Sequence, residues 1–177
     1  MMKYKGYHLI FWGTLLVIFN INLGALVIFP DIVGYIVVAI GVGYVLEGNI
    51  SQIARVTKFM SGAIVVGEGI NWLLVPSIDY FNSYFQVGSL ILGMMSLVMR
   101  YGLLEVEKEN DEDEIEKALW LKHQRNYLII HTLALVGTSF IINFPFLLGI
   151  IVLLSFLKEF YWLYLIYQLK KKWLCKE

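Results

Sequence analysis

The 177-residue chain has one cysteine and three prolines, and long parts of it lack lysine and arginine. With Cys175 alone, an intrachain disulfide is excluded, and so are Cys-x-x-Cys and Cys/His metal spacings. The sequence also lacks the His-Glu-x-x-His, Gly-x-Ser-x-Gly and P-loop signatures. We therefore expect no metal, no cofactor and no enzymatic activity.

Charged residues are scarce, at 16% of the chain, whereas 59% of the residues are hydrophobic. An average soluble domain is about 25% charged and about 45–50% apolar. A soluble fold of this length could not bury so much apolar surface, so we expect one integral membrane domain in a lipid bilayer. The chain has no general basic face, which argues against nucleic-acid binding.

Lysine and arginine are missing from three windows, each of which contains one proline. These are 6–54 with Pro30, 59–99 with Pro76, and 126–157 with Pro145. A membrane-spanning helix needs about 20 apolar residues, so each window can hold a hairpin, the third by running past Lys158. Proline disfavours helix in the residue before it and begins the next helix well. The pattern predicts an all-α polytopic bundle of three hairpins, with spans at about 7–29, 32–46, 59–75, 80–99, 127–144 and 146–169.

The basic residues indicate the orientation of these spans. Lys3 and Lys5 precede the first span, and four lysines follow the last one. The proline turns carry no lysine or arginine. Because basic residues near spans favour the cytoplasmic side, we predict a multi-pass protein of a bacterial-type cytoplasmic (inner) membrane with both termini in the cytoplasm.

Eight of the fourteen acidic residues lie between Glu105 and Glu116. We interpret 105–124 as a cytoplasmic acidic loop, because it is too charged to insert in a membrane. Its acidic-then-basic order also suits a helix dipole, with Ile115 and Leu119 on one face. The segment is either a solvated connector or, through Glu105–Glu116, a surface for a membrane or cytoplasmic protein partner.

A polar layer is predicted near the middle of the membrane. Glu68 and Asn22 each lie eight residues before a proline, which is roughly 12 Å along a helix. Asn20 and Asn71 lie close to them in sequence. These side chains could form interhelical hydrogen bonds, bind a solute, ion or proton, or sit exposed at the edge of a shorter span.

A second intramembrane group contains His131, Lys158 and Glu159. Counted from Pro145, the three reach a similar depth, so a contact between His131 and Glu159 with Lys158 beside it is possible. The alternatives are a satisfied core histidine and an aromatic interfacial belt that begins at Lys158.

Two further patterns concern packing. Small residues recur four apart at Ala39/Gly43, Ala63/Gly67 and Ser89/Gly93, which predicts close helix approach. The hairpins around Pro30 and Pro145 share six identities over positions 8–38 when shifted by 115 residues. This match indicates either a parallel internal repeat or convergence on a favourable turn.

Two functions fit these observations. The first is a small membrane protein that acts non-enzymatically through protein partners, as an assembly, regulatory or immunity-type subunit. The alternative is a small transporter, channel or substrate-binding membrane subunit with its polar site around Glu68.

Overall fold

The computed structural model describes residues 2–19, 22–23, 26–27, 31–74, 83–140, 146 and 148–176. Within these residues the chain consists of helices and their short connections, apart from two short strands. The helices are α1 (Met2–Ile18), α2 (Asp31–Val45), α3 (Gln52–Leu74), α4 (Ser83–Glu109), α5 (Glu114–Phe140) and α6 (Leu148–Lys176). Strands β1 (Asn22–Leu23) and β2 (Leu26–Val27) pair antiparallel. The predicted helical bundle is confirmed, while the prolines Pro30, Pro76 and Pro145 lie outside the described residues.

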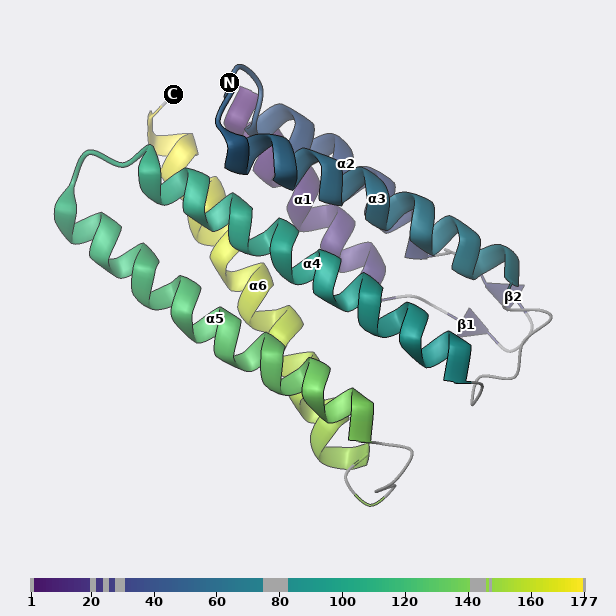
Figure 1. Ribbon diagram of the computed structural model, residues 1–177. Helices are drawn as coiled ribbons and strands as arrows, with labels where there is room; N and C mark the ends of the chain where they lie inside the picture. The colour runs from purple at the N-terminus through teal and green to yellow at the C-terminus, as the bar shows by residue number, and fades with distance from the viewer. Residues whose placement is uncertain are drawn as a thin grey trace.

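Each helix packs against the next one in sequence, and α6 also packs against α1, so the helices close into a ring. Figure 1 shows both termini at one end of the bundle, together with the short connections from α2 to α3 and from α4 to α5. Helices α3 and α5 end at the opposite end. This up-and-down order is the order that three consecutive hairpins produce.

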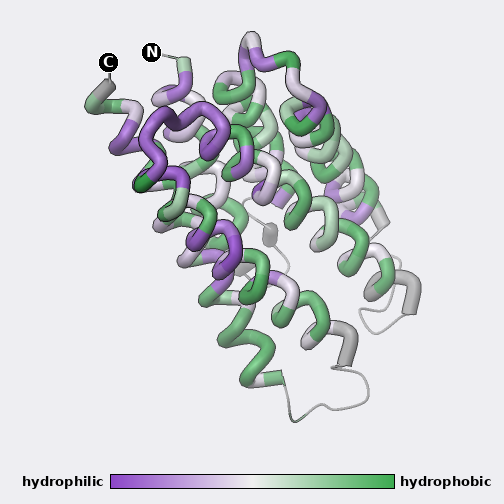
Figure 2. Tube along the Cα trace, turned by 60° about the vertical axis from the view of Figure 1, so that its left-hand side comes forward, coloured by the Kyte–Doolittle hydropathy of each residue, from purple (hydrophilic) through white to green (hydrophobic). Residues whose placement is uncertain are grey.

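Polar and apolar residues separate along the bundle. Figure 2 shows hydrophilic residues gathered at the end that carries the termini and hydrophobic residues along the remaining length. Many large apolar side chains face outward there, among them Phe59 of α3, Leu133 of α5 and Leu153 of α6. Within the described residues, two helical segments, Val87–Glu109 and Leu148–Cys175, are long and apolar enough to cross a membrane, and α2 is apolar but shorter.

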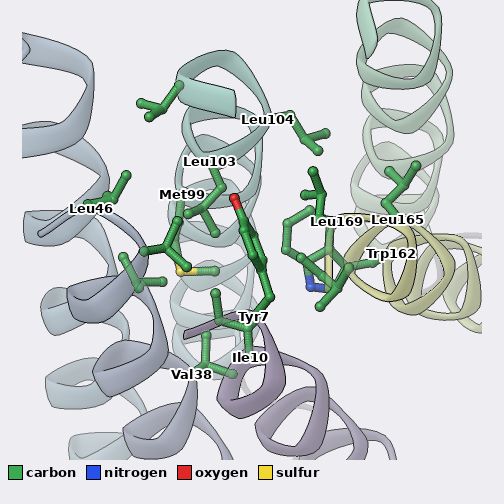
Figure 3. Packing of buried hydrophobic residues seen from close by; sticks show 14 of the residues in the cluster. Tyr7, Ile10, Val38, Leu46, Met99, Leu103, Leu104, Trp162, Leu165 and Leu169 are labelled. Carbon is green, nitrogen blue, oxygen red and sulfur yellow. The ribbon is translucent and has the colours of Figure 1, made fainter. Parts of the chain in front are cut away.

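The hydrophobic core lies toward the polar end. Tyr7 and Ile10 of α1 insert between Leu103 of α4 and the Trp162 and Leu169 side chains of α6 (Figure 3), and all five are fully buried. Burying a side chain of this kind stabilises a fold by about 1.5–3 kcal/mol. This cluster therefore fixes the helices against one another beside the polar end.

Helices α1 and α2 bring their backbones close together through four glycines. A Cβ atom on Gly6 would lie 2.8 Å from the carbonyl oxygen of Gly41, and one on Gly13 would lie 2.8 Å from that of Gly34. The contact is reciprocal, since a Cβ on Gly34 or Gly41 would lie equally close to the carbonyl of its partner. Only glycine lets two backbones approach so closely.

The predicted small-residue spacings did not identify this contact. Nothing lies within 4 Å of a Cβ built on Gly43, whereas Gly67 and Gly93 face the Leu92 and Leu135 side chains respectively. The observed spacing in α1 and in α2 is seven residues, or about two helical turns.

The prediction of a single helix over 7–29 is wrong. Helix α1 ends at Ile18, and Asn22 lies in β1. Asparagine side chains compete with the backbone for hydrogen bonds and disfavour helix interiors. Two of them, Asn20 and Asn22, follow the end of α1 within four residues.

The charged segment 105–124 is mostly helical, in keeping with the charge order and the shared face of Ile115 and Leu119 noted above. Helix α4 continues to Glu109 and α5 begins at Glu114, so only 110–113 connects them. Lys108 forms an ion pair with Glu105 one turn earlier on α4, at 2.6 Å. At the start of α5, the Ile115 backbone N–H donates to Asp113 Oδ1 at 2.9 Å. These local contacts favour helix over an extended connector.

Candidate functional site

One contact is described among the four residues of the predicted polar layer around Glu68. Asn71 Nδ2 donates to Glu68 Oε2 at 3.5 Å, but both residues belong to α3 and lie one turn apart. Asn20 lies outside the described residues, as does the side chain of Asn22. Because Asn22 belongs to β1, its depth cannot be counted along a helix. The two cavities described below are not lined by Glu68.

Arg100 forms a buried ion pair across the ring. Its side chain is 4% exposed, and Nη1 lies 2.9 Å from Glu159 Oε2, which links α4 to α6. Lys158 Nζ lies 2.9 Å from the other carboxylate oxygen of Glu159. The guanidinium also faces the Trp162 ring, 5.3 Å from its centroid. Charges this well buried are stable only when paired, so the three charges act as one unit.

A directed chain of hydrogen bonds extends from Arg100 to α5. Arg100 Nη1 donates to the Tyr127 hydroxyl at 2.9 Å, and that hydroxyl lies 2.7 Å from His131 Nδ1. His131 Nε2 lies 3.2 Å from the carbonyl oxygen of Gly93, which can only accept. The Nε2 atom therefore carries a proton, and in the neutral ring Nδ1 accepts from the Tyr127 hydroxyl.

The structure brings together the second predicted group, His131, Lys158 and Glu159. The expected direct contact between His131 and Glu159 is replaced by a path through Arg100 and Tyr127. His131 is fully buried with both ring nitrogens bonded, which supports its interpretation as a satisfied core residue.

Sequence reasoning missed Arg100 and Tyr127. Arg100 directly follows an apolar window, and the positive-inside rule assigns such a residue to the cytoplasmic flank. One signal was present, because Tyr127 and His131 lie four residues apart and so share a face of a helix.

A second buried acid, Glu107, lies at the polar end. Its side chain is 1% exposed and accepts hydrogen bonds from the Tyr7 hydroxyl at 2.9 Å and from Trp173 Nε1 at 2.5 Å. Lys3 Nζ lies 3.9 Å from the same carboxylate. Lys172, which is bonded to Asp111, lies 4.0 Å away. Glu107 thus joins α1, α4 and α6, so the alternative of a solvated connector does not describe this residue.

A cavity of about 630 Å³ lies between α5 and α6 at the polar end. Trp120 of α5 and Tyr164 of α6 line it, and Asp113 and Glu116 carry acidic groups at its α5 side. Lys171 lines the α6 side. The cavity combines aromatic surface with charges of both signs, a composition suited to recognition of a polypeptide.

His123 lines the same cavity and contacts the Tyr161 hydroxyl at 2.8 Å. Burial lowers the pKa of His123, and the charge of neighbouring Lys122 lowers it further. The ring is therefore neutral at physiological pH. Among the described residues, no group of three or more histidine, cysteine, aspartate or glutamate side chains is placed to hold a metal ion.

A smaller cleft of about 370 Å³ lies in the apolar half of the bundle. Ile18 lines it from α1, Thr138 from α5, and Ser155 and Phe156 from α6. Glu159 also lines the cleft, so the cleft reaches the buried ion pair.

Comparison with protein-family models, curated proteins and solved structures found no significant match to this chain.

Proposed function

We propose that the chain is a six-span integral membrane protein that acts non-enzymatically by binding a protein partner at its cytoplasmic face. The spans are the helical segments of the three hairpins, and the termini lie in the cytoplasm. The separation of a polar end from an outward-facing apolar surface supports this placement.

The observation that carries the partner proposal is the cavity between α5 and α6. It lies at the polar end, where the basic residues that flank the spans gather. Beside it, Ile115 is 79% exposed and Leu119 is 45% exposed, although both lie outside the predicted spans. Apolar side chains exposed to water beside a charged cavity are typical of a protein interface.

Orientation can be tested with the native cysteine. Cys175 is exposed and is the lone cysteine of the chain. A membrane-impermeant maleimide should label it in inside-out vesicles and leave it unlabelled in right-side-out vesicles. A Ser77→Cys, Cys175→Ser variant, which moves the thiol to a predicted outer turn, should give the opposite result. Labelling of Cys175 from the outside would contradict the proposed orientation.

Partner binding can be tested by photo-crosslinking in cells. A photo-crosslinking amino acid at Leu119, which lines the cavity, should yield one discrete adduct, whereas the same amino acid at Leu121 should not. The two side chains are about 200° apart on α5 and are both exposed. Glu116→Lys should abolish the Leu119 adduct, while Glu112→Lys, in the same acidic segment but outside the cavity lining, should preserve it. An equal adduct at both sites, or loss with both lysine variants, would contradict a specific interface.

The alternative function, a transporter, channel or substrate-binding subunit around Glu68, is supported less well. Glu68 bonds to Asn71 on its own helix and lines neither cavity. A pH-dependent transport activity abolished by Glu68→Gln would favour this alternative.

A further inference from the structure

The cleft beside Glu159 exists because α1 is shorter than α6. Lys3 lies 4.2 Å from the centroid of the Trp173 ring, and the Phe11 and Tyr167 rings lie 6.5 Å apart, which sets the antiparallel register of these helices. The same register places Ile18, the last residue of α1, opposite Glu159. Helix α6 continues for eleven residues beyond that level, to Leu148, or about 16 Å. This part of α6 faces the cleft without α1 beside it.

The apolar part of the cleft suits a ring-shaped lipophilic molecule. Phe156 lines it and stacks on Phe160 with ring centroids 6.3 Å apart, so a further aromatic ring could pack in the same manner. Its volume of about 370 Å³ holds about twelve non-hydrogen atoms, judged from the ~30 Å³ that each water occupies in the liquid. That is the size of a single ring with a short alkyl substituent.

The polar end of the cleft suits a hydrogen-bond donor without charge. Glu159 is the one charged residue lining the cleft within the described part of the chain, and a carboxylate has about four acceptor positions. Its described ionic partners are Arg100 and Lys158, which leaves acceptor capacity. A cationic head would add to a cluster that already has surplus positive charge, because Arg100 and Lys158 face the single carboxylate of Glu159. An anionic head would face Glu159 directly.

The depth of Glu159 restricts the ligand further. With α6 entering from the outer surface at Leu148, Glu159 lies about 16 Å inside, which is half of the ~30 Å hydrocarbon core. The charged headgroups of phospholipids stay at the membrane surface and cannot reach this level. A neutral, fully lipid-soluble molecule can.

We propose that this cleft binds a lipid-soluble phenol or hydroquinone, whose hydroxyl donates a hydrogen bond to Glu159 while its ring packs against Phe156. The site is independent of the partner surface at the polar end, but it rests on the proposed membrane placement. The maleimide experiment on Cys175 tests that placement by itself, so failure of the placement and failure of the site can be distinguished.

Photolabelling with a diazirine-bearing alkylphenol tests the site in purified protein reconstituted in vesicles. We expect labels on Ile18 and on the cleft side of α6, and competition by 4-hexylphenol about tenfold stronger than by 4-hexylanisole. The two competitors differ in the hydroxyl proton, and a hydrogen bond to a charged group is worth at least about tenfold in affinity. Equal competition by phenol and ether would overturn the assignment of Glu159 as the acceptor.

Two matched variants separate the cleft from general partitioning into lipid. Val152 lines the cleft, whereas Leu153 is exposed on the same helix and does not line it. Val152→Trp should fill the cleft and reduce labelling about tenfold, an effect on affinity of about 1.4 kcal/mol. Leu153→Trp should leave the labelling unchanged. Labelling that responds equally to both substitutions, or to neither, would overturn the site.

Discussion

The contact between α1 and α2 predicts opposite effects for two alanine substitutions in the same helix. A Cβ on Gly34 would lie 2.6 Å from Val17 Cγ2 and 2.8 Å from the Gly13 carbonyl oxygen. Ordinary contact begins near 3.4 Å, so Gly34→Ala requires α1 and α2 to separate by about 0.6 Å at this point. A Cβ on Gly43 meets nothing within 4 Å.

The magnitudes follow from these distances. Overpacking of a close contact costs about 1–3 kcal/mol, and backbone atoms cannot rotate away as a side chain can. Replacement of glycine by alanine inside a helix contributes about 1 kcal/mol of stability where space is available. Both variants gain this helix propensity, so we expect Gly34→Ala to be less stable than Gly43→Ala by the cost of overpacking, about 1–3 kcal/mol.

Reversible unfolding in mixed detergent micelles, followed by circular dichroism, would measure the difference. The double variant Gly6→Ala, Gly41→Ala should lose less than the sum of its single variants, because one added methyl already separates the two backbones. Equal unfolding free energies for Gly34→Ala and Gly43→Ala would refute the close contact, and additive losses would refute the pairing of Gly6 with Gly41.

Three further predictions concern the buried and titrating groups. Arg100→Ala should destabilise the fold by about 1–3 kcal/mol, because Glu159 keeps Lys158 as an ionic partner but loses its bond to Arg100, and a double-mutant cycle with Glu159→Ala should show coupling. Glu107→Gln should lower the free energy of unfolding by about 1–3 kcal/mol, whereas Glu109→Gln, on the exposed side of the same helix, should change it little in the same assay. Burial holds the pKa of His123 below its ordinary 6.5, so the unfolded chain binds the proton more readily than the folded chain. The contribution of neutral His123 to the free energy of unfolding should therefore be complete above pH 6.5 and be lost as the pH falls below it. Unfolding measured as a function of pH should show this dependence, and His123→Gln should remove it.

Sequence reasoning succeeded where a signal is carried by a long stretch of residues. Apolar windows and proline positions predict a helical bundle. The predicted segment 32–46 agrees closely with α2, whereas 59–75 covers most of α3 but misses its first seven residues. Such windows average over many residues, so single substitutions do not obscure them. Membrane insertion and the identity of each span remain proposals.

Sequence reasoning failed where one contact across the ring decides the outcome. Glu107 belongs to a run of acids that is typical of a solvated surface. It is nevertheless buried by Tyr7 and Trp173, which lie 100 and 66 residues away in sequence. Arg100 likewise depends on Glu159, which is fifty-nine residues later. Neither pairing leaves a periodic pattern in the sequence, because each depends on the order of helices around the ring.

The end of α1 at Ile18, earlier than the sequence predicted, also explains how the cleft forms. By the register that Lys3 and Phe11 set with α6, a helix continued to Phe29 would reach the level of Leu148 and cover the cleft along its whole length. The chain instead has Asn20 and Asn22 after the end of α1, and asparagine disfavours helix interiors. We infer that these asparagines matter for the site by ending α1, and not by lining a polar layer with Glu68. Leucine at both positions should lengthen α1 and block labelling of the cleft, whereas Asn71→Leu on α3 should leave the labelling intact.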